Sequence, residues 1–193
     1  MQTLMEFLRG LARLLGLGAP DPLSVLAQKA EVQTLREPLV LTESQTLLLK
    51  ELVERSRAEV GTTIVLFKGN GSGKVATAAS AATDLHRDLY RVNLGQVVSK
   101  YIGETEKNLD RLLPAAERVN GVLFFDEADP LFGKRSEVKD SHDRYANIEV
   151  SYLLQRLETY RGLAILATNS EDNFARDWKR FHFVLDFSEP ECE

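Results

Sequence analysis

The feature that most constrains the fold of this chain is a glycine-rich turn between an apolar run and an alanine-rich segment. The apolar run is 64–67, the alanine-rich segment is 75–82, and the turn between them reads Gly69-Asn70-Gly71-Ser72-Gly73-Lys74. Three glycines in five residues let the backbone approach an anion, because no Cβ stands in the way. A strand, a glycine turn and a helix start in this order gather backbone N–H groups around a phosphate, and Lys74 adds a positive charge. The stretch therefore predicts a phosphate-binding loop.

The loop departs from the usual phosphate-loop pattern at two positions. The pattern G-x-x-x-x-G-K-[ST] asks for Gly at 68 and for Ser or Thr at 75. This chain has Lys68 and Val75, so the loop counted from Gly69 is one residue short. The missing hydroxyl at position 75 normally ligates Mg²⁺. The alternative interpretation of the hexapeptide alone is a glycine turn with a nearby lysine.

Apolar runs alternate with helical patterns along most of the chain. We expect buried strands at 62–67, 89–94, 122–126, 163–167 and 182–187. We expect helices from 43 to about 59, from Lys74 to near His86, at 105–119 and at 143–160, the first with Thr42 as N-cap and Gln45 completing a capping box. Strands that alternate with helices predict an α/β sheet, with ligands at the carboxyl ends of its strands.

Composition bounds the class of protein. A chain of 193 residues suits one domain. The net charge of −5, with no cluster of Lys and Arg, argues against a nucleic-acid groove. Cys192 is the single cysteine, which excludes disulfides within one chain and fits a reducing cytoplasm.

The N-terminal segment has an organisation of its own. Residues 1–18 are rich in apolar residues, but Arg9 and Arg13 interrupt them, so we expect neither a signal peptide nor a membrane span. Their leucines recur at helical spacing and predict one apolar face, packed on its own domain or, alternatively, docked on a partner. A turn cluster at 16–22 follows. We expect an N-terminal helical extension over 1–41.

Polar residues follow two of the expected strands. Asp126 and Glu127 end the strand 122–126. In phosphoryl transfer the first acid can hold a metal ion and the second can activate the attacking water; the alternative is an acid pair that caps a turn. Asn169 follows the strand 163–167 and could orient a water against a γ-phosphate, although Asn after a strand is usually a turn residue.

A loop before the helix 105–119 carries an aromatic and a β-branched residue. Tyr101 and Ile102 precede Gly103, so we expect them at the tip of this loop. An exposed apolar tip of this kind can grip a polypeptide without reading its sequence. The alternative is that both side chains are packed in the core.

Together these motifs resemble the AAA+ ATPases, in particular the AAA branch as it occurs in bacterial ATP-binding proteins. The resemblance covers about 40–187 and rests on 66–74, 99–106, 124–129 and 167–169. It implies a P-loop NTPase-like three-layer sandwich, with helices on both faces of a five-stranded parallel sheet in the order 5-1-4-3-2. Residues 42–193 would be the large nucleotide-binding subdomain. The implied protein is a cytoplasmic ring, usually a homo-hexamer, that couples ATP hydrolysis to remodelling or threading of protein substrates, with no nucleic-acid or membrane partner.

The resemblance also implies roles for single residues, with ATP and Mg²⁺ as cofactors. The loop from Gly69 to Val75 would cradle the nucleotide, with Lys74 on the β- and γ-phosphates, and Asp126 would hold Mg²⁺. Catalysis would fall to three residues, namely Glu127 as the water-activating base, Asn169 as the γ-phosphate sensor and Arg180 as an arginine that reaches the neighbouring subunit's nucleotide. Tyr101 and Ile102 match the family's substrate-binding pore loop.

The chain departs from the family at positions that matter for turnover. Position 75 is Val and carries no hydroxyl, and where the family has paired arginines the candidates are Arg180 and Arg176. Since the sequence ends at Glu193, we expect the small helical lid of the family to be absent. Loss of the metal ligand and of the arginine would each slow hydrolysis on the order of 10³-fold. The alternative function is therefore a hydrolysis-impaired nucleotide-binding scaffold or assembly subunit. A remodeller of DNA strands is disfavoured by the acidic charge and the aromatic loop tip.

Overall fold

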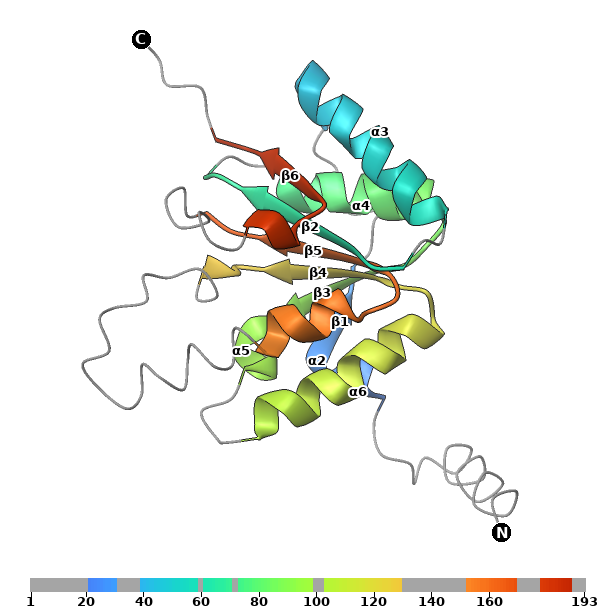
Figure 1. Cartoon of the computed structure of the whole chain (residues 1–193), viewed down its shortest axis with the longest axis vertical. Coiled ribbons are helices and arrows are strands. Elements are labelled where there is room, and N and C mark those ends of the chain that lie inside the picture. The colour runs from blue at the N-terminus through green and yellow to red at the C-terminus, as the bar shows by residue number, and fades with distance from the viewer. Residues whose placement is uncertain are drawn as a thin grey trace, which may run out of the picture.

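A sheet flanked by helices forms the described part of the computed structural model (Figure 1). The structure describes residues 21–30, 39–58, 61–70, 73–98, 103–129, 152–169 and 178–188. In chain order its elements are α2 (Pro22–Leu26), β1 (Ala27–Lys29), α3 (Glu43–Arg57), β2 (Thr63–Lys68), α4 (Lys74–Asp84), β3 (Leu89–Asn93), α5 (Leu94–Val97), α6 (Glu104–Arg118), β4 (Val122–Asp126), β5 (Leu163–Ala167), the 3₁₀ helix η2 (Trp178–Arg180) and β6 (Phe183–Asp186). Residues 152–158 are also helical.

The sheet confirms the predicted fold class and adds one strand to it. Its order is β1-β3-β4-β5-β2-β6, and the last five strands pair in parallel, which is the predicted order 5-1-4-3-2. The extra strand, β1, pairs antiparallel with β3 at the edge. The sequence pattern did not predict β1, because three residues of which two are exposed carry no recognisable periodicity.

The five parallel strands are buried because both faces of the sheet are covered. In Figure 1, α3 and α4 lie on one face, and α6 with the helical residues 152–158 lies on the other. Side chains alternate between the faces: Val65, Phe67, Phe124 and Ile165 pack with the alanines of α4, and Ile64, Leu66, Leu123 and Phe125 pack with the leucines of α6. This double burial explains why the strands read as unbroken apolar runs.

Helix α3 begins with the capping box that the sequence predicted. The backbone N–H of Gln45 donates to Thr42 Oγ1 at 3.2 Å, and the backbone N–H of Thr42 donates to Gln45 Oε1 at 2.8 Å. The helix ends at Arg57, two residues before the expected end. The predicted strands 122–126 and 163–167 coincide with β4 and β5, and the other predicted boundaries that the structure describes differ by at most two residues.

The predicted N-terminal extension is described only in part. Residues 1–20 and 31–38 lie outside the described residues, so the helical interpretation of 1–18 stays a prediction. Residues 22–29 form α2 and β1, and α2 packs beside α6. None of the helices in the described ranges is long and apolar enough to span a lipid bilayer.

The capping box yields a first prediction. Thr42→Ala removes the oxygen that accepts the Gln45 N–H, so the free energy of unfolding should fall by about 1 kcal/mol. Urea denaturation followed by circular dichroism measures the loss. Thr42→Ser keeps the hydroxyl and should stay close to the wild type; an equal loss in both variants would contradict the role of the hydroxyl.

Candidate functional site

The carboxyl ends of β2, β4 and β5 meet at one edge of the sheet, and backbone hydrogen bonds continue there beyond the strands. Thr168 N donates to Phe67 O at 2.9 Å, and Ala128 N donates to Ala167 O at 2.7 Å. These two bonds fix the first residues after β4 and β5 relative to β2. The polar residues that follow the strands are therefore held by the backbone of the sheet.

The glycine turn after β2 has the backbone conformation that its glycines allow. Gly69 has φ +96° and Gly73 has φ +94°, both in the left-handed region. A Cβ at Gly69 would lie 2.4 Å from Ser188 N, so this position has no room for a side chain. Gly73 is the N-cap of α4. The predicted loop residues Gly71 and Ser72 lie outside the described residues, and Asn70 is exposed.

Lys74 is the first residue of α4 and is buried, with only 9% of its surface exposed. Its Nζ donates to Asn169 Oδ1 at 2.9 Å. Burial lowers the pKa of Lys74, while the negative charges of Asp126 and Asp129 act in the opposite direction. The structure thus brings Lys74, Asp126 and Asn169 together from three different strand ends, as the sequence predicted.

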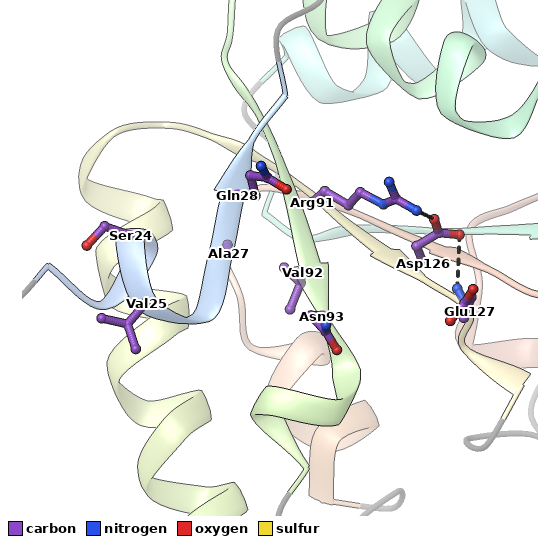
Figure 2. Close-up of a pocket in the computed structure, with 9 residues that line it drawn as sticks. All are labelled: Ser24, Val25, Ala27, Gln28, Arg91, Val92, Asn93, Asp126 and Glu127. Carbon is purple, nitrogen blue, oxygen red and sulfur yellow. Dashed lines mark hydrogen bonds and ion pairs between the residues drawn. The ribbon is translucent and has the colours of Figure 1, made fainter.

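The two acids after β4 differ in conformation and exposure. Asp126 is the last residue of β4; its Oδ1 accepts the backbone N–H of Glu127 at 3.0 Å, and its Oδ2 pairs with the guanidinium of Arg91 (Figure 2). Glu127 is exposed and has φ +52°. A left-handed conformation is costly for Glu, and such residues gather at functional sites.

Asp129 is a site residue to which the sequence assigned no role. Its Oδ1 accepts hydrogen bonds from Thr168 Oγ1 and from Asn169 N, each at 3.0 Å. Asp129 therefore ties the segment after β4 to the segment after β5 and fixes the backbone of Asn169. The signal in the sequence was a third carboxylate, three positions after Asp126.

The described residues fit the phosphates of a nucleotide better than they fit a divalent metal ion. The left-handed glycines, the buried Lys74 and the start of α4 form an anion site of the expected kind. Val75 offers no oxygen, and both carboxylate oxygens of Asp126 are already engaged, one by Arg91 and one by the Glu127 N–H. Within the described ranges, no group of three or more His, Cys, Asp and Glu residues is placed to hold a metal.

Comparison with protein families settles the membership of the chain. Residues 64–189 match the model of the ATPase family associated with various cellular activities (AAA). The chain belongs to the AAA family.

Two relatives illustrate the similarity in sequence. An uncharacterized AAA family ATPase, y4kL, of Sinorhizobium fredii is 29% identical over 185 residues, which cover 90% of this chain and 56% of the relative. The cell division cycle protein 48 homolog of Archaeoglobus fulgidus is 30% identical over 147 residues, 75% of this chain and 19% of the relative. The chain therefore spans only part of the length of these relatives.

Solved structures show the same fold. The complex of HORMA, CdnC and Trip13 from E. coli MS115-1 contains a chain that matches with a TM-score of 0.62 at 18% identity, covering 87% of this chain and 72% of that one. The FIGL-1 AAA domain in complex with ADP matches with a TM-score of 0.58 at 22% identity, covering 87% and 60%. At these identities the likeness concerns the fold alone.

Three residues of this AAA chain with predicted functional roles remain. Tyr101 and Ile102 lie outside the described residues, so the pore-loop interpretation stays a prediction. Arg180 lies in η2, ahead of β6, and its Nη1 pairs with Glu158 Oε1 at 3.1 Å. Since His182 N donates to Ile64 O, this segment runs beside the amino-terminal half of β2, away from the glycine turn.

The bridge made by Asp129 yields a second prediction. Asp129→Ala leaves the donors of Thr168 and Asn169 without their acceptor, so the free energy of unfolding should fall by about 1–3 kcal/mol. Asp129→Asn keeps an acceptor oxygen and should lose less. Urea denaturation of both variants measures this, and equal losses would show that the charge, not the hydrogen bonds, holds the bridge.

Proposed function

We propose that this chain is an AAA nucleotide-binding domain that takes ATP at the carboxyl edge of its sheet. The observation that carries the proposal is the placement of Lys74, which is buried at the N-terminus of α4, follows the left-handed Gly73 and touches Asn169. The ADP bound to the FIGL-1 AAA domain, a structural neighbour, supports adenine nucleotide as the ligand class.

The roles of the site residues follow from their places at this edge. The loop from Gly69 to Val75 would cradle the phosphates, and Lys74 would exchange part of its contact with Asn169 for the β- and γ-phosphates. Asn169, whose backbone N–H donates to Asp129, would contact the γ-phosphate or a water beside it. The exposed Glu127 is the candidate base for that water. Asp126, the residue expected to hold Mg²⁺, is discussed below with Arg91.

We propose further that hydrolysis is slow compared with binding. Gly69, Gly73 and the buried Lys74 supply the described part of the anion site, whereas Val75 supplies no metal ligand and Asp126 is engaged by Arg91. A metal ion held by Asp126 would neutralise the charge that develops in phosphoryl transfer. The nucleotide would therefore keep most of its phosphate-binding residues, while hydrolysis would lose the metal ion.

The ring and its protein substrate are proposed from the family resemblance and from one structural neighbour. That neighbour is a complex in which Trip13 is bound together with HORMA and CdnC. By resemblance to the family, this chain would form a homo-hexamer or another ring in the cytoplasm, with Arg180 acting on the next subunit's nucleotide and with Tyr101 and Ile102 gripping a polypeptide. Breaking the ion pair of Arg180 with Glu158 would be part of that assembly.

Nucleotide binding is the direct test of the proposed function. Lys74→Ala removes the buried cation of the anion site, so the affinity for ATP measured by isothermal titration calorimetry should fall at least tenfold. Lys50→Ala removes an exposed lysine of α3 and serves as the matched control with unchanged affinity. A wild-type chain that binds no ATP would overturn the proposal.

Hydrolysis is tested separately by phosphate release. The wild-type chain should turn over more slowly than about one ATP per second, the ordinary range of enzymes being faster. Val75→Thr restores a hydroxyl beside Lys74 and should raise the rate, and Glu127→Gln should abolish it. Turnover above one per second in the wild type would refute slow hydrolysis, and activity that survives in Glu127→Gln would indicate a contaminating ATPase.

A further inference from the structure

The contact between Arg91 and Asp126 follows from the register of two neighbouring strands. Asn93 of β3 pairs with Asp126 of β4, and Arg91 stands two residues before Asn93. Residues two apart point to the same face, so Arg91 and Asp126 share the face of the sheet that carries α4. A long side chain reaches such a diagonal neighbour, and Figure 2 shows the guanidinium of Arg91 extended onto the carboxylate.

This contact engages the carboxylate of Asp126, the group that would hold a metal ion by resemblance to the family. One oxygen of Asp126 pairs with Arg91, and the other accepts the Glu127 N–H at 3.0 Å. The side chain of Asp126 is only 24% exposed, whereas that of Arg91 is 53% exposed and borders a pocket of about 520 Å³ that Asp126 and Glu127 also line. Arg91 is thus the more exposed partner of the pair, and residues of α2 and β1 complete the pocket that it borders.

We propose that Arg91 is a built-in cation of this site, which takes the place of the divalent metal, so that the chain binds nucleotide without Mg²⁺. The inference rests on the proposed nucleotide binding. A guanidinium stays protonated at every accessible pH, and its five N–H donors match carboxylate and phosphate oxygens. Arg91 can therefore neutralise Asp126 and still offer donors to a phosphate.

Two features of the site act together against a metal ion, and neither would exclude it alone. The first is the ion pair of Arg91 with Asp126. A half-exposed ion pair is weak, so a metal with good ligands would displace Arg91 from Asp126. The second feature is Val75, which gives such a metal no hydroxyl ligand. Because the metal would have to break the ion pair and gain only one carboxylate in return, the fixed cation prevails.

The first test compares ATP binding by the wild-type chain in EDTA and in excess MgCl₂, by isothermal titration calorimetry. We expect dissociation constants within twofold of each other. A gain of tenfold or more with Mg²⁺ would overturn the proposal. Absence of binding in both buffers would refute the proposed function instead, and the metal-binding test below would then decide on Arg91.

Variants of Arg91 sharpen the comparison. Arg91→Ala leaves Asp126 as an unpaired carboxylate beside the phosphates, so ATP affinity in EDTA should fall at least fivefold and be largely restored by MgCl₂. Arg91→Lys keeps the charge and should remain insensitive to the metal. Arg57→Ala removes an exposed ion pair with Glu54 and a hydrogen bond to Asp84 O at the end of α4 farthest from Lys74, and it serves as the control. Equal metal dependence in the wild type and Arg91→Ala would contradict the inference.

A nucleotide-free measurement separates Arg91 from the question of ATP binding. Mn²⁺ binding is followed by water-proton relaxation, with circular dichroism to verify folding. Arg91→Ala should bind Mn²⁺ more tightly than the wild type because it frees the carboxylate of Asp126, and the double variant Arg91→Ala, Asp126→Asn should lose that gain. Equal Mn²⁺ binding by the wild type and Arg91→Ala, or none by either, would overturn the claim that Arg91 occupies the place of the metal.

Discussion

The parallel register of β2, β5 and β4 is the constraint on which the site depends. Phe67 pairs with Ala167, and Phe125 pairs with Leu166, so the three strands end almost level. The backbone bonds of Thr168 and Ala128 carry this alignment past the strand ends. A lysine, an aspartate and an amide that lie far apart in the sequence are therefore brought to one edge by the backbone, and the hydrogen bond from Lys74 to Asn169 then joins two of them. The alignment is secured by the apolar cores on both faces of the sheet.

At this edge of the sheet, a positive side chain and two negative ones stabilise one another although they are partly buried. Lys74 is buried, and burial favours its neutral form, whereas the carboxylates of Asp126 and Asp129 favour the ammonium. Asp129 serves two purposes, since it also fixes the backbone of Asn169. The same carboxylates would repel phosphates unless cations balance them, so the position of every positive charge at this edge bears on nucleotide binding.

The sequence predicted what depends on local pattern and missed what depends on pairing between strands. Continuous apolar runs revealed the five parallel strands, and the spacing from Thr42 to Gln45 revealed the capping box. The strand β1 escaped because three residues show no period, and the ion pair of Arg91 with Asp126 escaped because it requires the register of β3 against β4. Asp129 stood inside a recognised motif, but its partners come from the end of another strand.

The ion pair of Arg91 with Asp126 and the apolar side chain of Val75 both bear on how this AAA chain would interact with a metal ion. A metal ion does two things in phosphoryl transfer, since it neutralises the phosphates and it also aligns them with the attacking water. A guanidinium fixed on Asp126 can supply the first of these, because it is a permanent positive charge with spare donors, but it offers no exchangeable coordination sites for the second. The loss of the hydroxyl at Val75 removes the ligand that would let a metal compete. In the proposed site, Arg91 and Val75 would therefore act in the same direction, preserving the electrostatics of binding while weakening the geometry of hydrolysis.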